Sequence, residues 1–176
     1  MPGIEDGQIR LEAWANFFLV ISTAATTLVG LLFVVITLAA DRLPASETRR
    51  IRHYLTPTVV CFGSVLLLSG LLTIPTHSRL SIALCCAVLG FSGMAYALSL
   101  LRGLRDDRFL DRTDVWKYAV LPAAAYGLLV AGGGTLYAAS SSAGLTLIAV
   151  AMLGLIALAL RNSWSIAVSI VSTSRS

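Results

Sequence analysis

The chain has 176 residues, of which 57% are hydrophobic and 12% charged, and its formal net charge is +4. Charged residues make up about a quarter of an ordinary soluble domain, so this composition excludes that class and indicates a multi-pass α-helical membrane protein. The excess of basic residues needs no nucleic-acid partner, because such residues also fix the orientation of membrane helices.

Apolar segments predict an all-α bundle of five transmembrane helices in a single domain, residues 1–176. Runs of roughly 20 apolar residues are long enough to cross the hydrocarbon core. Thr56-Pro57 is interpreted as the cap and first turn of the second helix, where proline costs little. The tail, residues 161–176, either extends the fifth helix or lies in the membrane interface with Trp164 as an anchor. The predicted spans are residues 14–40, 56–74, 80–101, 116–138 and 144–160.

The first predicted helix carries a small and polar face. Asn16, Thr23, Gly30 and Thr37 recur every seven residues, and Thr27 lies beside that line. This spacing predicts a candidate polar helix seam that packs against other helices, where Thr and Asn side chains form hydrogen bonds. The alternative is that the same face lines a polar path for an ion or a small solute.

Small residues at the same spacing mark the second and third predicted helices as helix-packing elements. The pattern predicts that the first three helices form the core, with the fourth and fifth packed around them. In the fourth, Pro122 and the run Gly132–Gly134 predict a kink or a looser end. The packing residues are Gly63 and Gly70 in the second helix and Ala83, Gly90, Gly93 and Ala97 in the third.

Basic residues predict the orientation of the bundle. With five spans, eleven Lys and Arg residues fall on the side of the loop that follows the first helix, against two on the other side. Positive charge accumulates on the cytoplasmic side, so we expect the N-terminus outside and the C-terminus in the cytoplasm. Abundant Arg, Ala and Leu are typical of a GC-rich bacterial genome, which favours the inner (plasma) membrane of a bacterium.

Asp106, Asp107 and Asp111 form the only cluster with enzyme-like character. The sequence DDRFLD over 106–111 resembles the DDxxxD spacing with which membrane prenyltransferases hold Mg²⁺ and a diphosphate. Those enzymes use two such clusters and a larger bundle, and these aspartates alternate with arginines. We therefore favour a solvated loop of ion pairs.

Other candidate features have simple interpretations. Arg49, Arg50 and Arg52 are candidate contacts for anionic lipid head groups on the cytoplasmic side, or serve only to fix the topology. The three cysteines lie in apolar runs and are expected to act as small hydrophobic side chains. No Asp, Glu, Lys, Arg or His lies well inside a span, which disfavours proton-coupled pumps and voltage sensors. No catalytic triad, metal motif or phosphate loop appears, so we expect no cofactor and no catalysis.

Three functions follow from these patterns, in order of preference. The first is a structural, accessory or regulatory membrane module that associates with itself or with another membrane protein. The second is an oligomeric channel or facilitator for an ion or small solute, with the Asn and Thr face turned inward. The third is a membrane enzyme that uses the loop of Asp106, Asp107 and Asp111.

Overall fold

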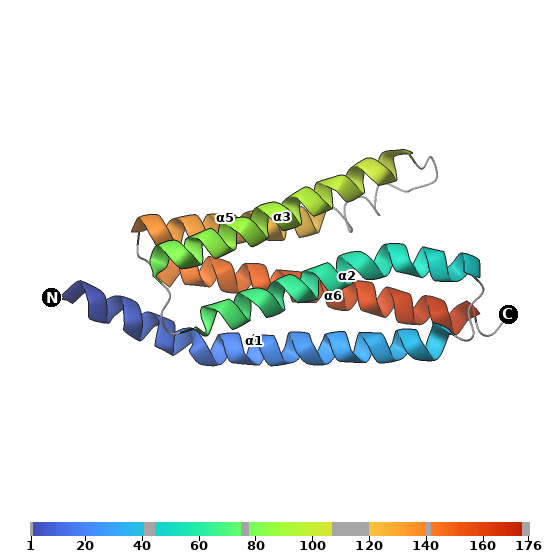
Figure 1. Ribbon diagram of the computed structural model, residues 1–176, viewed down its shortest axis with the longest axis horizontal. Helices are drawn as coiled ribbons and strands as arrows, with labels where there is room; N and C mark the ends of the chain where they lie inside the picture. The colour runs from blue at the N-terminus through green and yellow to red at the C-terminus, as the bar shows by residue number, and fades with distance from the viewer. Residues whose placement is uncertain (1, 41–44, 75–77, 107–119, 140–141, 174–176) are drawn as a thin grey trace.

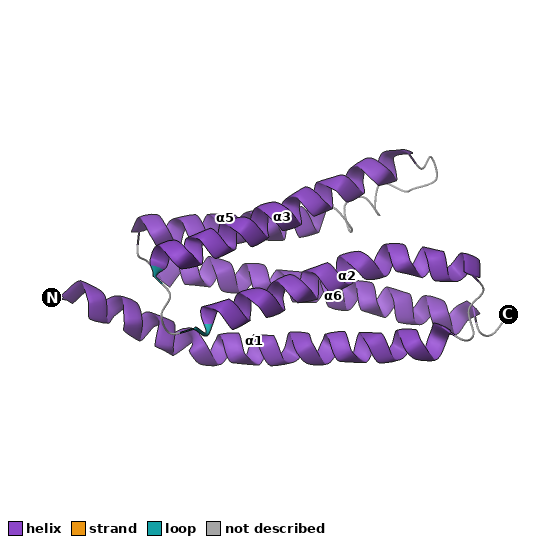
Figure 2. Ribbon diagram, in the orientation of Figure 1, coloured by secondary structure: helices purple, strands orange, loops and turns teal. Residues whose placement is uncertain are grey.

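A computed structural model describes residues 2–40, 45–74, 78–106, 120–139 and 142–173 of the chain. Side-chain surroundings are described for 13–38, 55–74, 78–100, 120–139 and 142–168, except 166. All regular structure in the described ranges is helical (Figure 2). The helices are α1 (Pro2–Ala40), α2 (Ala45–Leu72), α3 (Arg79–Asp106), α5 (Leu121–Ala139) and α6 (Ser142–Thr173).

Within the described residues, five helices are long and apolar enough to cross a membrane, which confirms the predicted all-α class and the number of candidate spans. The longest candidate, Ala13–Leu38, has 26 residues. At ~1.5 Å per residue it exceeds the ~30 Å hydrocarbon core, and the 18 residues of Leu55–Leu72 nearly match it. The other three candidates are Arg79–Leu100, Leu121–Ala139 and Ser142–Ser165.

Several helix boundaries differ from the prediction. Helix α1 begins at Pro2 rather than at residue 14, and α3 ends at Asp106 rather than at residue 101. Helix α2 begins at Ala45 rather than Thr56, so Pro57 lies inside the helix instead of in its first turn. Proline in a helix interior costs ~3 kcal/mol, but the preceding residues include good helix formers and the Pro57 side chain is buried. Helix α6 continues to Thr173, so the tail extends the fifth helix, which was one of the two alternatives.

The small-residue pattern does not predict which helices pack against each other. Helix α5 lies between α3 and α6, which are its two most extensive partners, while α2 contacts α1, α6 and α3. Helix α1 lies at one side of the bundle and α3 at the other (Figure 1). The structure therefore differs from the expected core of the first three spans, because α1 and α3 lie at the sides (Figure 1) while α2 and α6 each pack against three other helices.

The core is made mainly of large side chains, to which all five helices contribute. Helix α1 contributes a buried stripe, Phe18, Ile21, Ala25 and Leu32. At 100° per residue this stripe lies on the opposite side of α1 from Asn16, Thr23, Gly30 and Thr37. The largest fully buried side chains of the other helices include Phe62, Leu68, Ile82, Tyr126, Leu129, Ile148, Met152 and Leu155.

Candidate interaction surfaces

The polar face of α1, which we define as Asn16, Thr23, Thr27, Gly30 and Thr37, is exposed along its whole length. It points away from the bundle because the opposite stripe of the helix is buried. Among the five candidate spans α1 also has the smallest buried share, and large side chains such as Phe33 and Leu38 are exposed beside the polar face. No helix in the described part of the chain therefore covers this face.

The hydroxyl groups of this face are bonded within α1. Thr23 Oγ1 donates to the Leu19 carbonyl, Thr27 Oγ1 to the Thr23 carbonyl and Thr37 Oγ1 to the Val34 carbonyl, each at 2.9 Å. These bonds satisfy the hydroxyl protons without a partner helix. The hydroxyl oxygens keep lone pairs that can accept a further hydrogen bond.

Glycines on α1 and α2 lie in open space. A Cβ atom added at Gly30, Gly63 or Gly70 would meet no heavy atom within 4 Å. Helix α2 packs through larger side chains such as Phe62 and Leu68. The predicted packing residues of α2 therefore contact no other helix closely, and a neighbouring backbone has room to approach them.

The small residues of α3 lie against α5. A Cβ at Gly90 would collide with the Val130 side chain and lie 3.0 Å from the Tyr126 carbonyl oxygen. At Gly93 it would collide with the Tyr126 ring. Ala97 is buried. The line Ala83, Gly90, Gly93 and Ala97 thus includes two close approaches to α5.

The closest approaches involve α5, for which a kink or a looser end was expected. A Cβ at Gly132 would lie 2.9 Å from the backbone nitrogen of Ile148 on α6. A Cβ at Gly133 would lie 2.7 Å from the Cβ of Cys86 on α3. Successive residues point 100° apart on a helix, so two adjacent glycines serve two different neighbours. Their adjacency within an apolar run is the signal that could have identified α5 as a helix packed between two others.

A small polar cluster lies inside the bundle between α2 and α5. Ser64 Oγ donates to the Val60 carbonyl at 2.8 Å and lies 2.9 Å from Tyr126 Oη. Since the Ser64 proton is used, we assign the Tyr126 hydroxyl as the donor to Ser64. The Cys61 thiol is hydrogen-bonded to the same phenol. The cluster joins two helices and contains no charged group.

The remaining polar features concern possible metal ligands and one buried amide. No group of three or more His, Cys, Asp or Glu side chains among the described residues is placed to hold a metal ion. Asn162 on α6 is 3% exposed, and its Oδ1 atom has no hydrogen-bond partner in the described part of the chain.

Several predicted site residues fall outside the described part. Asp106 is the last residue of α3, whereas Asp107 and Asp111 lie outside the described residues. Arg49, Arg50 and Arg52 belong to the first turns of α2, and their side chains lie outside the described set.

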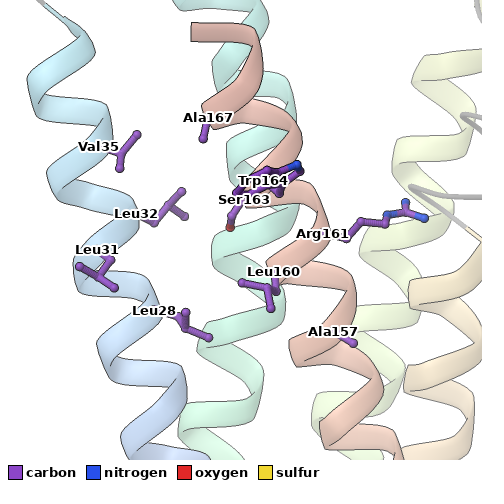
Figure 3. Close-up of a pocket in the computed structure, with 10 residues that line it drawn as sticks. All are labelled: Leu28, Leu31, Leu32, Val35, Ala157, Leu160, Arg161, Ser163, Trp164 and Ala167. Atoms are coloured by element: carbon purple, nitrogen blue, oxygen red, sulfur yellow. The ribbon is translucent and has the colours of Figure 1, made fainter. Parts of the chain in front are cut away.

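A groove of about 660 Å³ lies between α1 and α6. Leu28, Leu32 and Val35 line it from α1, and Leu160 and Trp164 line it from α6 (Figure 3).

Comparison with protein-family models, with curated proteins and with solved structures finds no match to this chain.

Proposed function

We propose that the protein is a non-enzymatic membrane module, structural, accessory or regulatory, which associates through the polar face of α1 with a second copy of itself or with another membrane protein. The observation that carries this proposal is the exposure of the whole face beside an open glycine. Small residues let helix backbones approach closely in a membrane, where van der Waals packing drives association.

The proposal places all five helices across the inner membrane of a bacterium. The eleven-to-two distribution of basic residues supports an external N-terminus and a cytoplasmic C-terminus. In this orientation the basic segments meet the anionic head groups of the cytoplasmic leaflet, including the segment with Arg49, Arg50 and Arg52.

Energy transfer between donor- and acceptor-labelled copies in liposomes tests self-association. Gly30→Leu should place a large side chain where the partner backbone approaches. Overpacking of ~1 to 3 kcal/mol would raise the dissociation constant roughly 5- to 150-fold.

The matched control is Gly134→Leu, an exposed glycine on α5 that also has no heavy atom within 4 Å of an added Cβ. Both variants should keep the fold, and only Gly30→Leu should weaken association. Equal energy transfer in both variants would refute an α1 interface between copies.

A channel or facilitator for an ion or small solute is the second candidate, because the exposed face of α1 carries hydroxyl oxygens with free lone pairs. Several copies would have to turn these faces towards a common axis to enclose a polar path. Solute flux into liposomes that appears only in the oligomer, and that Thr23→Val reduces, would favour this candidate over a purely structural module.

A further inference from the structure

The groove between α1 and α6 is apolar along most of its length. Leu28, Leu31, Leu32 and Val35 form its α1 wall, and Leu160 extends from α6 towards that wall (Figure 3). Ser163 also lines it, but its hydroxyl donates to the Ala159 carbonyl at 2.9 Å. Most of this lining lies within the candidate spans Ala13–Leu38 and Ser142–Ser165. In the membrane that we propose for this chain, the groove therefore opens into hydrocarbon.

We infer that this groove binds one acyl chain of an anionic phospholipid from the cytoplasmic leaflet. An apolar concave surface offers water no hydrogen-bond partners, so hydrocarbon is the material that fills it. Its volume of about 660 Å³ lies within the range of ~300 to 1,000 Å³ that is usual for sites holding small molecules.

The charge at one end of the groove determines the preferred head group. Trp164 lies at that end, and an exposed Trp side chain is favoured at the membrane interface. The last turns of α1 and α6 and the first turns of α2 gather at the same end of the bundle (Figure 1). The sequence there carries Arg49, Arg50 and Arg52.

This basic end attracts a negative head group when the acyl chain lies in the groove. Arg161 also lines the groove, although its side chain extends from α6 away from α1 (Figure 3). The charge of the whole end therefore acts on a head group that the acyl chain in the groove holds at this end, and no single ion pair is needed.

Quenching of Trp164 fluorescence by brominated lipids tests the inference. The chain has three tryptophans, so Trp14→Phe and Trp116→Phe leave Trp164 as the single reporter. The protein is reconstituted into vesicles in which brominated dioleoylphosphatidylglycerol or brominated dioleoylphosphatidylcholine replaces part of an unbrominated lipid. We expect phosphatidylglycerol to quench at a roughly fivefold lower mole fraction, the factor that corresponds to ~1 kcal/mol for one basic residue near the surface.

Two variants fill the groove from opposite walls. Ala157→Phe acts from α6 and Val35→Phe acts from α1, and both positions are exposed, so the fold should be retained. Each should abolish the preference for phosphatidylglycerol. Ala131→Phe, at an exposed alanine of α5 outside the groove, should leave the preference unchanged.

Equal quenching by the two lipids in the parent, or a preference that survives both groove-filling variants, would overturn the inference. Protection of Trp164 from both lipids that increases with protein density would also overturn it, by identifying a second copy as the occupant. The inference rests on the proposed membrane location but not on self-association, because the groove and the polar face lie on different sides of α1. Loss of energy transfer in Gly30→Leu with unchanged lipid preference would separate the two proposals.

Discussion

Gly132 on α5 gives the sharpest test of how the bundle is held together. A Cβ added there would lie 2.9 Å from the backbone nitrogen and 2.9 Å from Cγ1 of Ile148, and 3.1 Å from the Gly144 carbonyl oxygen. Two of these atoms belong to the α6 backbone, so a rotamer change cannot relieve the contact. Gly132→Ala must therefore move α5 away from α6 and lose dispersion contacts along at least one turn.

Gly134→Ala is the matched control because it makes the same change two residues later, where an added Cβ meets no heavy atom within 4 Å. Both variants gain up to ~1 kcal/mol of helix propensity, so this term cancels in the comparison. The difference between them is the overpacking cost of ~1 to 3 kcal/mol. For a chain of this size that difference corresponds to roughly 2 to 12 °C in the thermal midpoint.

The assay is loss of helical circular dichroism on heating in detergent, with the parent and both variants in the same micelles. We expect the thermal midpoint of Gly134→Ala to equal or exceed that of the parent. The midpoint of Gly132→Ala should lie clearly below that of Gly134→Ala. Equal midpoints for the two variants would refute the close approach of α5 to α6.

Two further predictions concern the core and the orientation. Tyr126→Phe should lower the free energy of unfolding in detergent by only ~0.6 kcal/mol, because Ser64 keeps its bond to the Val60 carbonyl. Tyr126→Ala should lower it by ~3 to 5 kcal/mol, because it leaves a cavity where a side chain that is 1% exposed was packed. A large loss of stability in Tyr126→Phe would instead show that the hydroxyl network contributes more to stability. A reporter that fluoresces only in the cytoplasm should be bright when fused after Ser176 and dark when inserted after Ala143; the reverse result would invert the topology.

The number and approximate positions of the helices could be predicted because they depend on local properties of the chain. An apolar run of about 20 residues is recognisable without any knowledge of its neighbours. The start of α2 could not be located in the same way. Proline is acceptable in the first turn of a helix, and it is tolerated in a helix interior when neighbouring helices pack around it. The Pro57 side chain is buried in this way inside α2, and its burial depends on the other helices.

Which helices meet depends on long-range information that a single sequence holds only weakly. Gly30 on α1 and Gly90 on α3 belong to similar seven-residue patterns. A Cβ would meet nothing within 4 Å at Gly30, whereas at Gly90 it would collide with Val130. A small residue permits close approach but does not specify the partner, so the same pattern serves an internal contact in one helix and an exposed face in another.

The structure of α1 shows how both roles can be separated on one helix. Its large side chains Phe18, Ile21 and Leu32 dock onto the bundle, because bulky groups fill the space where several helices converge. Its small and hydroxyl-bearing residues are then left on the opposite face, where close approach is possible only for a helix from outside this chain. Since the threonine protons are already bonded to α1 carbonyls, exposing that face to lipid leaves no hydroxyl donor unsatisfied. The separated protein can therefore be stable with this face uncovered, and association can be reversible, which suits an accessory or regulatory module better than an obligate subunit.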